Sequence, residues 1–343
     1  MSREIGSEFW DAPTKEVDTD LFPHNIEWFL SGRVALKSII HEIKRMAHSV
    51  AMPSWCCESM VEPFLSSGID VEFYPVYLGE YGILQEICLE CDALFVMDYF
   101  GYSTALPDLS NYKGIVIRDV THSFFSANYQ DADYYFGSLR KWCGVWTGGY
   151  AWPQDGHKLQ IEEYVDLNYI SLREKAMQLK CHYVEGAQKN GYDCTNDKEY
   201  LKVFEKAEAI LESGYTVSGA AKRDVEIAKK LDIDLIKKRR ISNAKVLMDE
   251  LTEYLIFPKL KQTDCPMFVP IVVPEGKRNR LRQYLIWENI YCPIHWPLNK
   301  NYCLDGRARF LYDNELSLVC DQRYSEDDMR KVVAAIKLFL VRD

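Results

Sequence analysis

The chain has 343 residues, of which 48% are hydrophobic and 27% charged, a composition typical of a globular protein with one large core and a smaller one. Because a domain has roughly 150 residues on average, a chain of this length is expected to form two domains. The formal net charge of −10 argues against nucleic acid as the main partner, because phosphate binding requires a basic face.

Targeting and cysteine patterns indicate a cytoplasmic protein. The polar and acidic segment 1–10 does not resemble a secretory signal, and no apolar run approaches the ~20 residues of a membrane span. The 11 cysteines show no paired spacing, so we expect reduced thiols. Cys88 and Cys91 form an isolated C-x-x-C, and because a metal site needs about four ligands, we expect no metal.

Apolar periodicity in the first half of the chain predicts helices that alternate with short strands. We expect one helix over 31–48, with its start at Ser31-Gly32, and another over 58–66. Residues 81–90 could also be helical. Strand-like runs lie at 71–74, 93–97, 114–117, 133–136 and 149–152. This alternation indicates an α/β fold with a mostly parallel sheet, and such sheets bind ligands at the carboxyl ends of their strands.

The second half of the chain is charged and mostly helical as far as residue 260, with amphipathic stretches over 198–212 and 224–253. We then expect strands over 267–273 and 316–320, a helix over 278–288, and a closing helix that begins at Ser325. This pattern predicts a smaller α+β domain. We therefore divide the chain into a large domain of residues 1–235 and a small C-terminal domain of residues 236–343.

The segment Phe136 to Gly149, FGSLRKWCGVWTGG, contains a candidate nucleophile. Lys141 follows an expected strand, lies three residues after Ser138, and has Trp142 and Trp146 beside it. A lysine near apolar rings is partly desolvated, and this favours the neutral amine that attacks an aldehyde. On spacing alone, a surface lysine in a loop rich in aromatic residues remains the alternative.

Asp119 is the second candidate, because it lies at the end of an expected buried strand upstream of Lys141. A buried carboxylate needs a cationic partner. The protonated ring nitrogen of pyridoxal phosphate (PLP) is such a partner, since proteins hold PLP by a lysine Schiff base and pair its pyridinium with an acid. The alternative is a plain ion pair of Asp119 with Arg118 or Arg140.

The start of the first expected helix is a candidate phosphate site. Backbone N–H groups at a helix start bind phosphate, and Gly32 would let the backbone approach closely. Arg33 could add a charge-assisted contact, and Ser138 could donate its hydroxyl. Many helices begin in this way, so the S-G-R sequence at Ser31 is weak evidence when taken alone.

Taken together, and in this order, these segments resemble fold-type I PLP enzymes, and more closely the DegT/DnrJ/EryC1/StrS family of sugar aminotransferases. The similarity runs from about residue 25 to the end. Residues 31–36 resemble the S-G-T-x-A-L phosphate helix of that family, and residues 118–122 its E-D-A-A-Q/H motif. Lys141 with the turn at 147–149 resembles its Schiff-base lysine and T-G-E-G-G turn. Further segments resemble the cofactor-stacking segment (53–57), a strand end (98–101) and the start of a long helix (239–244).

The resemblance assigns a role to each matching residue. Lys141 would hold PLP, Asp119 would contact the pyridine nitrogen, and His122 would lie near the 3′-oxygen. Trp55 or Cys57 would cover the ring. Asn168 of a partner subunit would reach the phosphate.

Two departures from the family pattern bear on the substrate. Arg33 replaces a small hydroxyl residue, and Ser138 precedes the lysine by three residues instead of five. His295 could line the site from the small domain, or could simply pack beside Trp296.

The function implied by the resemblance is a PLP-dependent aminotransferase. Its amino donor would be an amino acid, its acceptor a nucleotide-linked keto sugar, and its active site would lie at the interface of a homodimer. One alternative is a PLP enzyme with a different reaction, such as dehydration or amino-acid chemistry, although the sugar dehydratases of the family have histidine in place of the lysine. The other alternative is a non-catalytic relative that has kept the fold.

Overall fold

The fold is built on a seven-stranded sheet. The expectation of a mostly parallel sheet is confirmed, although strand β2 at its edge was not predicted from the sequence. The computed structural model describes residues 4–19, 21–87, 90–103, 108–126, 131–161, 165–190, 198–212, 217–273, 276–298 and 306–342. The strand order is β2-β10-β9-β8-β7-β3-β4, and β10 runs antiparallel to both of its neighbours. The strands are β2 (Glu27–Phe29), β3 (Ser49–Pro53), β4 (Asp70–Tyr74), β7 (Ala93–Met97), β8 (Ile115–Asp119), β9 (Tyr134–Ser138) and β10 (Gly149–Pro153).

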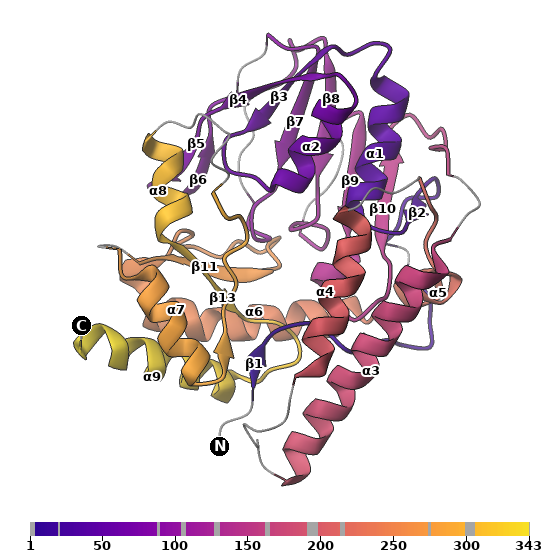
Figure 1. The fold of residues 1–343 in the computed structure, drawn as a ribbon. Helices are drawn as coiled ribbons and strands as arrows, with labels where there is room; N and C mark the ends of the chain where they lie inside the picture. The colour runs from indigo at the N-terminus through magenta and orange to yellow at the C-terminus, as the bar shows by residue number, and fades with distance from the viewer. Residues whose placement is uncertain are drawn as a thin grey trace.

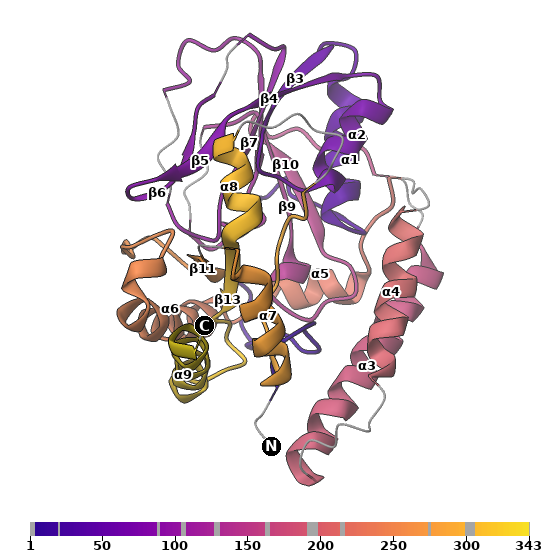
Figure 2. The ribbon, with the colours of Figure 1, turned by 60° about the vertical axis from the view of Figure 1, so that its left-hand side comes forward.

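Two helices near the N-terminus cover one face of this sheet (Figures 1 and 2). They are α1 (Gly32–Ile43) and α2 (Glu58–Ser66). Both begin where the sequence predicts and α2 has the expected length, whereas α1 ends five residues before the expected position 48. The Ser31 hydroxyl accepts a hydrogen bond from the N–H of Val34 and so caps α1, because the first N–H groups of a helix have no partner within it. The apolar residues of α1 are buried against the sheet, which fixes where this helix start lies.

The C-terminal part of the chain packs below the sheet in the view of Figure 1. Strands β11 (Phe268–Val272) and β13 (Glu315–Val319) pair antiparallel. Helices α6 (Ile233–Glu250), α7 (Arg278–Trp287) and α9 (Glu326–Arg342) lie around them. Helix α8 (Gly306–Asn314) lies higher in Figure 1 and packs against the strand β5 (Val76–Gly79). Ser325 and Asp328 cap the start of α9 reciprocally, since each side chain accepts from the backbone N–H of the other.

The N-terminus joins this lower part of the molecule. Strand β1 (Ile5–Gly6) pairs parallel with β12 (Ile290–Tyr291), and Figure 1 shows β1 among the C-terminal elements. The largest cluster of buried apolar side chains has members from Ile5 to Phe339, so one core joins residues from both sides of the expected domain boundary. The division at residues 235 and 236 therefore stays a prediction.

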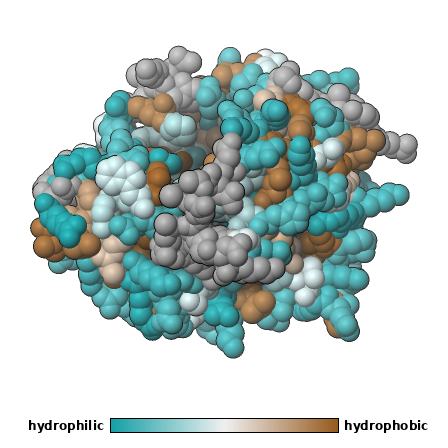
Figure 3. Space-filling view, turned by 60° about the horizontal axis from the view of Figure 1, so that its bottom comes forward, coloured by the Kyte–Doolittle hydropathy of each residue, from teal (hydrophilic) through white to brown (hydrophobic). Residues whose placement is uncertain are grey.

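Helices α3 (Leu167–Asn190) and α4 (Glu199–Glu212) pack side by side and extend beyond the lower layer in Figures 1 and 2. A small cluster of buried side chains lies between them: Ala176, Met177, Tyr200, Val203 and Phe204. The shorter helix α5 (Lys222–Lys229) follows. The described part of the chain contains no helix long and apolar enough to cross a membrane. The face drawn in Figure 3 is mostly hydrophilic, with apolar residues interspersed.

Two expectations about secondary structure are wrong. The described part of 81–90 is not helical, because β5 (Val76–Gly79) and β6 (Gly82–Gln85) form a hairpin there with a two-residue turn. Gly82 has φ 138°, which an L side chain rarely adopts. The stretch 224–253 is divided at Lys230 into α5, α6 and the short 3₁₀ helix η2 (Thr252–Tyr254), because Asp232 caps a new helix by accepting from Leu235 N–H at 3.0 Å.

Candidate active site

The carboxyl ends of three adjacent parallel strands line a cavity of about 240 Å³. Met97, Asp119 and Ser138 are the last residues of β7, β8 and β9, and all three are buried. The start of α1 and, from the C-terminal part of the chain, His295 and Trp296 close the other sides. The cavity therefore lies at the edge of the sheet where parallel α/β sheets bind ligands, and Asp119 and Ser138 bring polar side chains to it.

Lys141 lies in the 3₁₀ turn η1 (Leu139–Lys141) and has an exposed side chain. It lines the first cavity and a second cavity of about 420 Å³ beside it. The expected desolvation of Lys141 by the neighbouring tryptophans is wrong. Trp142 is buried and donates from Nε1 to the Thr121 carbonyl at 2.6 Å, while Trp146 lies under the guanidinium of Arg223. The tryptophans therefore anchor the turn instead of covering the amine.

Asp119 is 4% exposed, and its Oδ1 accepts from the N–H of Thr121 at 2.8 Å. Burial raises its pKa to about 6, and the bonds to Thr121 and the charge of Lys141 partly oppose this rise. Neither arginine of the alternative interpretation pairs with it. Arg118 binds Asp98 and Asp131, and Arg140 binds Glu208. Among the described residues, Asp119 has no ion-pair partner, so a cation in the cavity would complete the site.

His122 is buried between the sheet and Trp296, with ring centroids 5.5 Å apart and planes at 20°. Its Nδ1 accepts from the Phe100 N–H at 3.2 Å, so the neutral ring carries its proton on Nε2. Burial and the charge of Lys141 lower the pKa of His122 to about 3. Phe100 adopts φ 57°, a conformation uncommon for a side chain of this size. The backbone therefore holds His122 as a neutral donor.

The start of α1 leaves backbone donors unused. The N–H groups of Gly32 and Arg33 make no hydrogen bond to a described residue, whereas Arg33 Nη1 donates to the carbonyl of Leu211 at 3.1 Å. A Cβ on Gly32 would lie 3.2 Å from the Gly137 carbonyl oxygen, and one on Gly149 would lie 2.0 Å from that of Ser31. The glycines let this helix start lie directly against β9 and β10, where it can accept an anion.

The remaining predicted residues lie in three different environments. Cys57 is half-buried and lines the cavity, and Ser59 Oγ donates to its sulfur at 3.0 Å. Trp55 is 1% exposed, stacks on Tyr99 and lines neither cavity. Asn168 is exposed on α3 and also lines neither cavity. The structure therefore brings Gly32, Arg33, Cys57, Asp119, His122, Ser138 and Lys141 together.

A charged cluster between the two cavities was not predicted from the sequence. Glu208 of α4 binds Arg140 at 2.6 Å and Arg173 of α3 at 3.5 Å. Although burial opposes it, the positive charge of Arg140 and Arg173 lowers the pKa of Glu208 to about 2. Nε of Arg140 and Nε of Arg173 are buried without a hydrogen-bond partner. No sequence motif predicts this cluster, because its formation depends on how α3 and α4 pack against the 3₁₀ turn η1 that contains Arg140 and Lys141.

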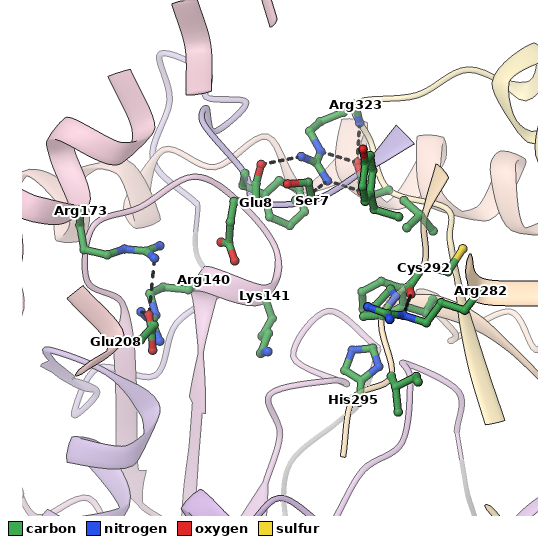
Figure 4. A pocket seen from close by; sticks show the side chains of 18 residues that line it. Ser7, Glu8, Arg140, Lys141, Arg173, Glu208, Arg282, Cys292, His295 and Arg323 are labelled. Carbon is green, nitrogen blue, oxygen red and sulfur yellow. Dashed lines mark hydrogen bonds and ion pairs between the residues drawn. The ribbon is translucent and has the colours of Figure 1, made fainter. Parts of the chain in front are cut away.

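The N-terminal segment and residues from the C-terminal part of the chain line two sides of the larger cavity (Figure 4). Arg323 donates to the carbonyls of Ser7 and Glu8 and so holds this segment over the cavity. The lining residues carry more positive than negative charge. The cations are Arg140, Lys141, Arg173, Arg282 and Arg323, and the carboxylates are Glu8, Glu208 and Asp321.

A metal site is not built from the described residues, which contain no suitable group of three or more His, Cys, Asp or Glu. Cys88 lies outside the described residues, and Cys91 is a buried free thiol.

Comparison with solved structures identifies the fold. The chain superposes on a DegT DnrJ EryC1 StrS aminotransferase from Brucella abortus with a TM-score of 0.57 and 16% identity, covering 92% of this chain and 85% of that one. For Spr1654 of Streptococcus pneumoniae in its PLP form, described as a sugar aminotransferase, the TM-score is 0.61 at 13% identity, covering 97% and 98%. CalS13, a sugar aminotransferase from Micromonospora echinospora, gives 0.56 at 15% identity, covering 91% and 87%. No family model matches the sequence, and no curated protein is significantly similar to it. The chain therefore has the fold-type I architecture of these aminotransferases.

Proposed function

We propose that the chain is a PLP-dependent aminotransferase that moves an amino group from an amino acid to a nucleotide-linked keto sugar. One observation carries this proposal: one cavity is lined by an exposed lysine and by a buried carboxylate that forms no ion pair with a described residue. The start of α1 lies in the same cavity with unused N–H groups. Spr1654, which has the same fold, is described in PLP and PMP forms, and this supports the choice of cofactor.

The described residues fit PLP group by group. Lys141 offers the amine for the aldehyde, and Asp119 offers the negative charge that keeps a pyridine nitrogen protonated. The N–H groups at Gly32 and the hydroxyl of Ser138 suit a phosphate, and His122 presents an N–H donor. When bound, PLP supplies an electron sink for negative charge on the substrate carbon. Lys141 Nζ can then accept and return the proton of that carbon.

The substrate class and the assembly are part of the proposal. The excess of positive charge around the larger cavity suits an acceptor that carries phosphate groups. The active site would lie at a homodimer interface, in a cytoplasmic enzyme. Asn168 is exposed on α3, where a second copy of the chain could contact it.

An absorbance spectrum tests the cofactor directly. Purified protein mixed with PLP should show the visible band of a lysine Schiff base, and Lys141→Ala should lose it. Lys113→Ala, which removes an exposed lysine next to the amino end of β8, at the opposite edge of the sheet, is the matched control and should keep the band. A wild-type protein without the band would refute the cofactor assignment.

The same sample tests the reaction class. Adding glutamate should convert the visible band toward the amine form of the cofactor. A band that no amino donor changes would favour the alternative, a PLP enzyme with a different reaction.

A further inference from the structure

A chain of three polar side chains leads from the core of the small domain into the candidate site. Glu315 and Ser317 lie two residues apart on β13 and are both buried, at 2% and 0% exposure. Ser317 Oγ lies 2.5 Å from Glu315 Oε1 and 2.9 Å from His295 Nδ1. Because side chains two residues apart on a strand share a face, Glu315 and Ser317 lie together, and Ser317 links Glu315 to His295.

His295 is placed where a substrate would lie. It lines both cavities, as Lys141 does, and Figure 4 shows the two side chains entering the larger cavity from different elements. With Nδ1 held by Ser317, the other ring nitrogen, Nε2, makes no hydrogen bond to a described residue. The hydrogen bond at the buried Nδ1 therefore determines which ring nitrogen carries the proton, and so determines whether Nε2 donates or accepts in the cavity.

The three side chains have two arrangements that differ by one proton. When Glu315 is protonated, it donates to Ser317, Ser317 donates to Nδ1, and His295 carries its proton on Nε2. When Glu315 is ionised, Ser317 donates to the carboxylate, Nδ1 carries the proton, and Nε2 presents a lone pair. Passing from the first arrangement to the second releases one proton from Nε2 without charging the imidazole.

We propose that Glu315, Ser317 and His295 form a proton relay that exchanges one proton with the substrate beside Lys141. The relay rests on the proposed amine transfer, which requires such an exchange. When an amine condenses with a carbonyl, the nitrogen loses two protons, a C=N bond forms, the C–O bond breaks, and the oxygen leaves as water with those protons. Nε2 with a lone pair can take a proton from nitrogen, and Nε2–H can give one to oxygen.

The groups around the relay are compatible with a proton that moves near neutral pH. Burial raises the pKa of Glu315 to about 8, although Ser317 and Arg278 of α7 oppose the rise. Burial, His122 and Lys141 lower the pKa of His295, so the imidazole stays neutral in both arrangements.

The neighbouring groups do not compete for the proton. The Cys292 thiol stays protonated, because burial raises its pKa to about 12. Arg282 of α7 lines the same cavity, and its Nε donates to the Cys292 carbonyl, so this hydrogen bond holds Nε away from His295.

Nitrogen NMR of ¹⁵N-histidine-labelled protein without cofactor tests the relay itself. In the wild type, His295 should carry its proton on Nε2 below about pH 8 and on Nδ1 above it. Glu315→Gln removes the titrating group, and Ser317→Ala breaks the link, so both variants should hold one tautomer from pH 6 to 9. Glu253→Gln, an exposed site on η2, is the control and should still switch. A wild type with one tautomer throughout, or a Glu315→Gln variant that still switches, would overturn the relay.

Kinetics of the PLP-loaded protein separate the relay from the cofactor assignment. Ser317→Ala should keep the visible band and the KM for the acceptor but lower kcat by about 100-fold. An unchanged kcat would overturn the relay and leave the band intact. A missing band in the wild type would overturn the proposed function but not the tautomer switch. If Glu315→Gln does not fold, Ser317→Ala is used for both the tautomer titration and the measurement of kcat.

Discussion

Replacing Asp119 with asparagine should stabilise the cofactor-free protein at neutral pH, although the same change should weaken PLP binding. The Asp119 carboxylate is 4% exposed and has no ion-pair partner among the described residues. Asparagine has the same shape, and its side-chain oxygen can still accept the Thr121 N–H bond of 2.8 Å. The substitution therefore removes a buried charge and changes little else.

The magnitude follows from the pKa of Asp119, which burial raises from 3.8 to about 6. Between these two values the folded chain binds more protons than the unfolded chain, so the free energy of unfolding falls as the pH rises through this window. A shift of about two pH units corresponds to about 3 kcal/mol. The destabilisation is complete above pH 6 and absent below about pH 4.

Urea unfolding without PLP, followed by circular dichroism from pH 4 to 8, measures this effect. The stability gap between Asp119→Asn and the wild type should be near zero at pH 4 and should approach 3 kcal/mol above pH 6 in favour of the variant. Asp249→Asn, an exposed carboxylate on α6, should show no such trend. A gap that does not depend on pH, or one that grows toward low pH, would refute the reasoning. Adding PLP should reverse the order, because only the wild type has a charge for the pyridinium.

Two further substitutions test the cavity walls. Gly149→Ala places a Cβ 2.0 Å from the Ser31 carbonyl oxygen, so it should displace the start of α1, weaken the binding of inorganic phosphate and PLP in titrations, and cost about 2 kcal/mol of stability. Gly186→Ala, where a Cβ meets nothing within 4 Å, is its control, and equal losses in both variants would contradict the assignment. Cys57→Phe should lower the Kd for PLP about fivefold, because an aromatic ring would then line the cavity beside the cofactor. Cys181→Phe on α3 should leave the Kd unchanged, and a higher Kd for Cys57→Phe would mean that the ring lies elsewhere.

Local sequence signals were sufficient to predict the elements that contain the residues proposed to bind PLP. Ser31 marks the start of α1 because a hydroxyl cap is a property of a few neighbouring residues. Asp119 and Lys141 follow apolar runs that are too short for helices and are bounded by polar residues. The hairpin over 76–85 was missed because its strands have four residues each and are held by tertiary packing, including Phe257 against Gly82.

The substrate side of the site could not be predicted in this way. Arg173 and Glu208 come from two helices whose sequences read only as charged and amphipathic. His295 lies in an irregular segment, and the sequence left open whether it lines the site or packs beside Trp296. The structure supports both statements, since His295 lines the cavities and lies 5.6 Å from the Trp296 ring. Contacts between distant segments determine these positions, and no local pattern encodes them.

The departures from the family motifs affect residues next to the proposed PLP site more than the residues that we propose to contact PLP. Arg118 occupies the place of a glutamate in the family motif, but it is held by Asp98 and Asp131, so the neighbouring Asp119 keeps its place at the strand end. Arg33 replaces a hydroxyl residue, but its guanidinium is bound to the Leu211 carbonyl. The N–H groups at the helix start remain available in consequence. Differences in substrate should therefore be sought in the α3–α4 wall and in the wall from the C-terminal part of the chain, away from the residues that we propose to bind PLP.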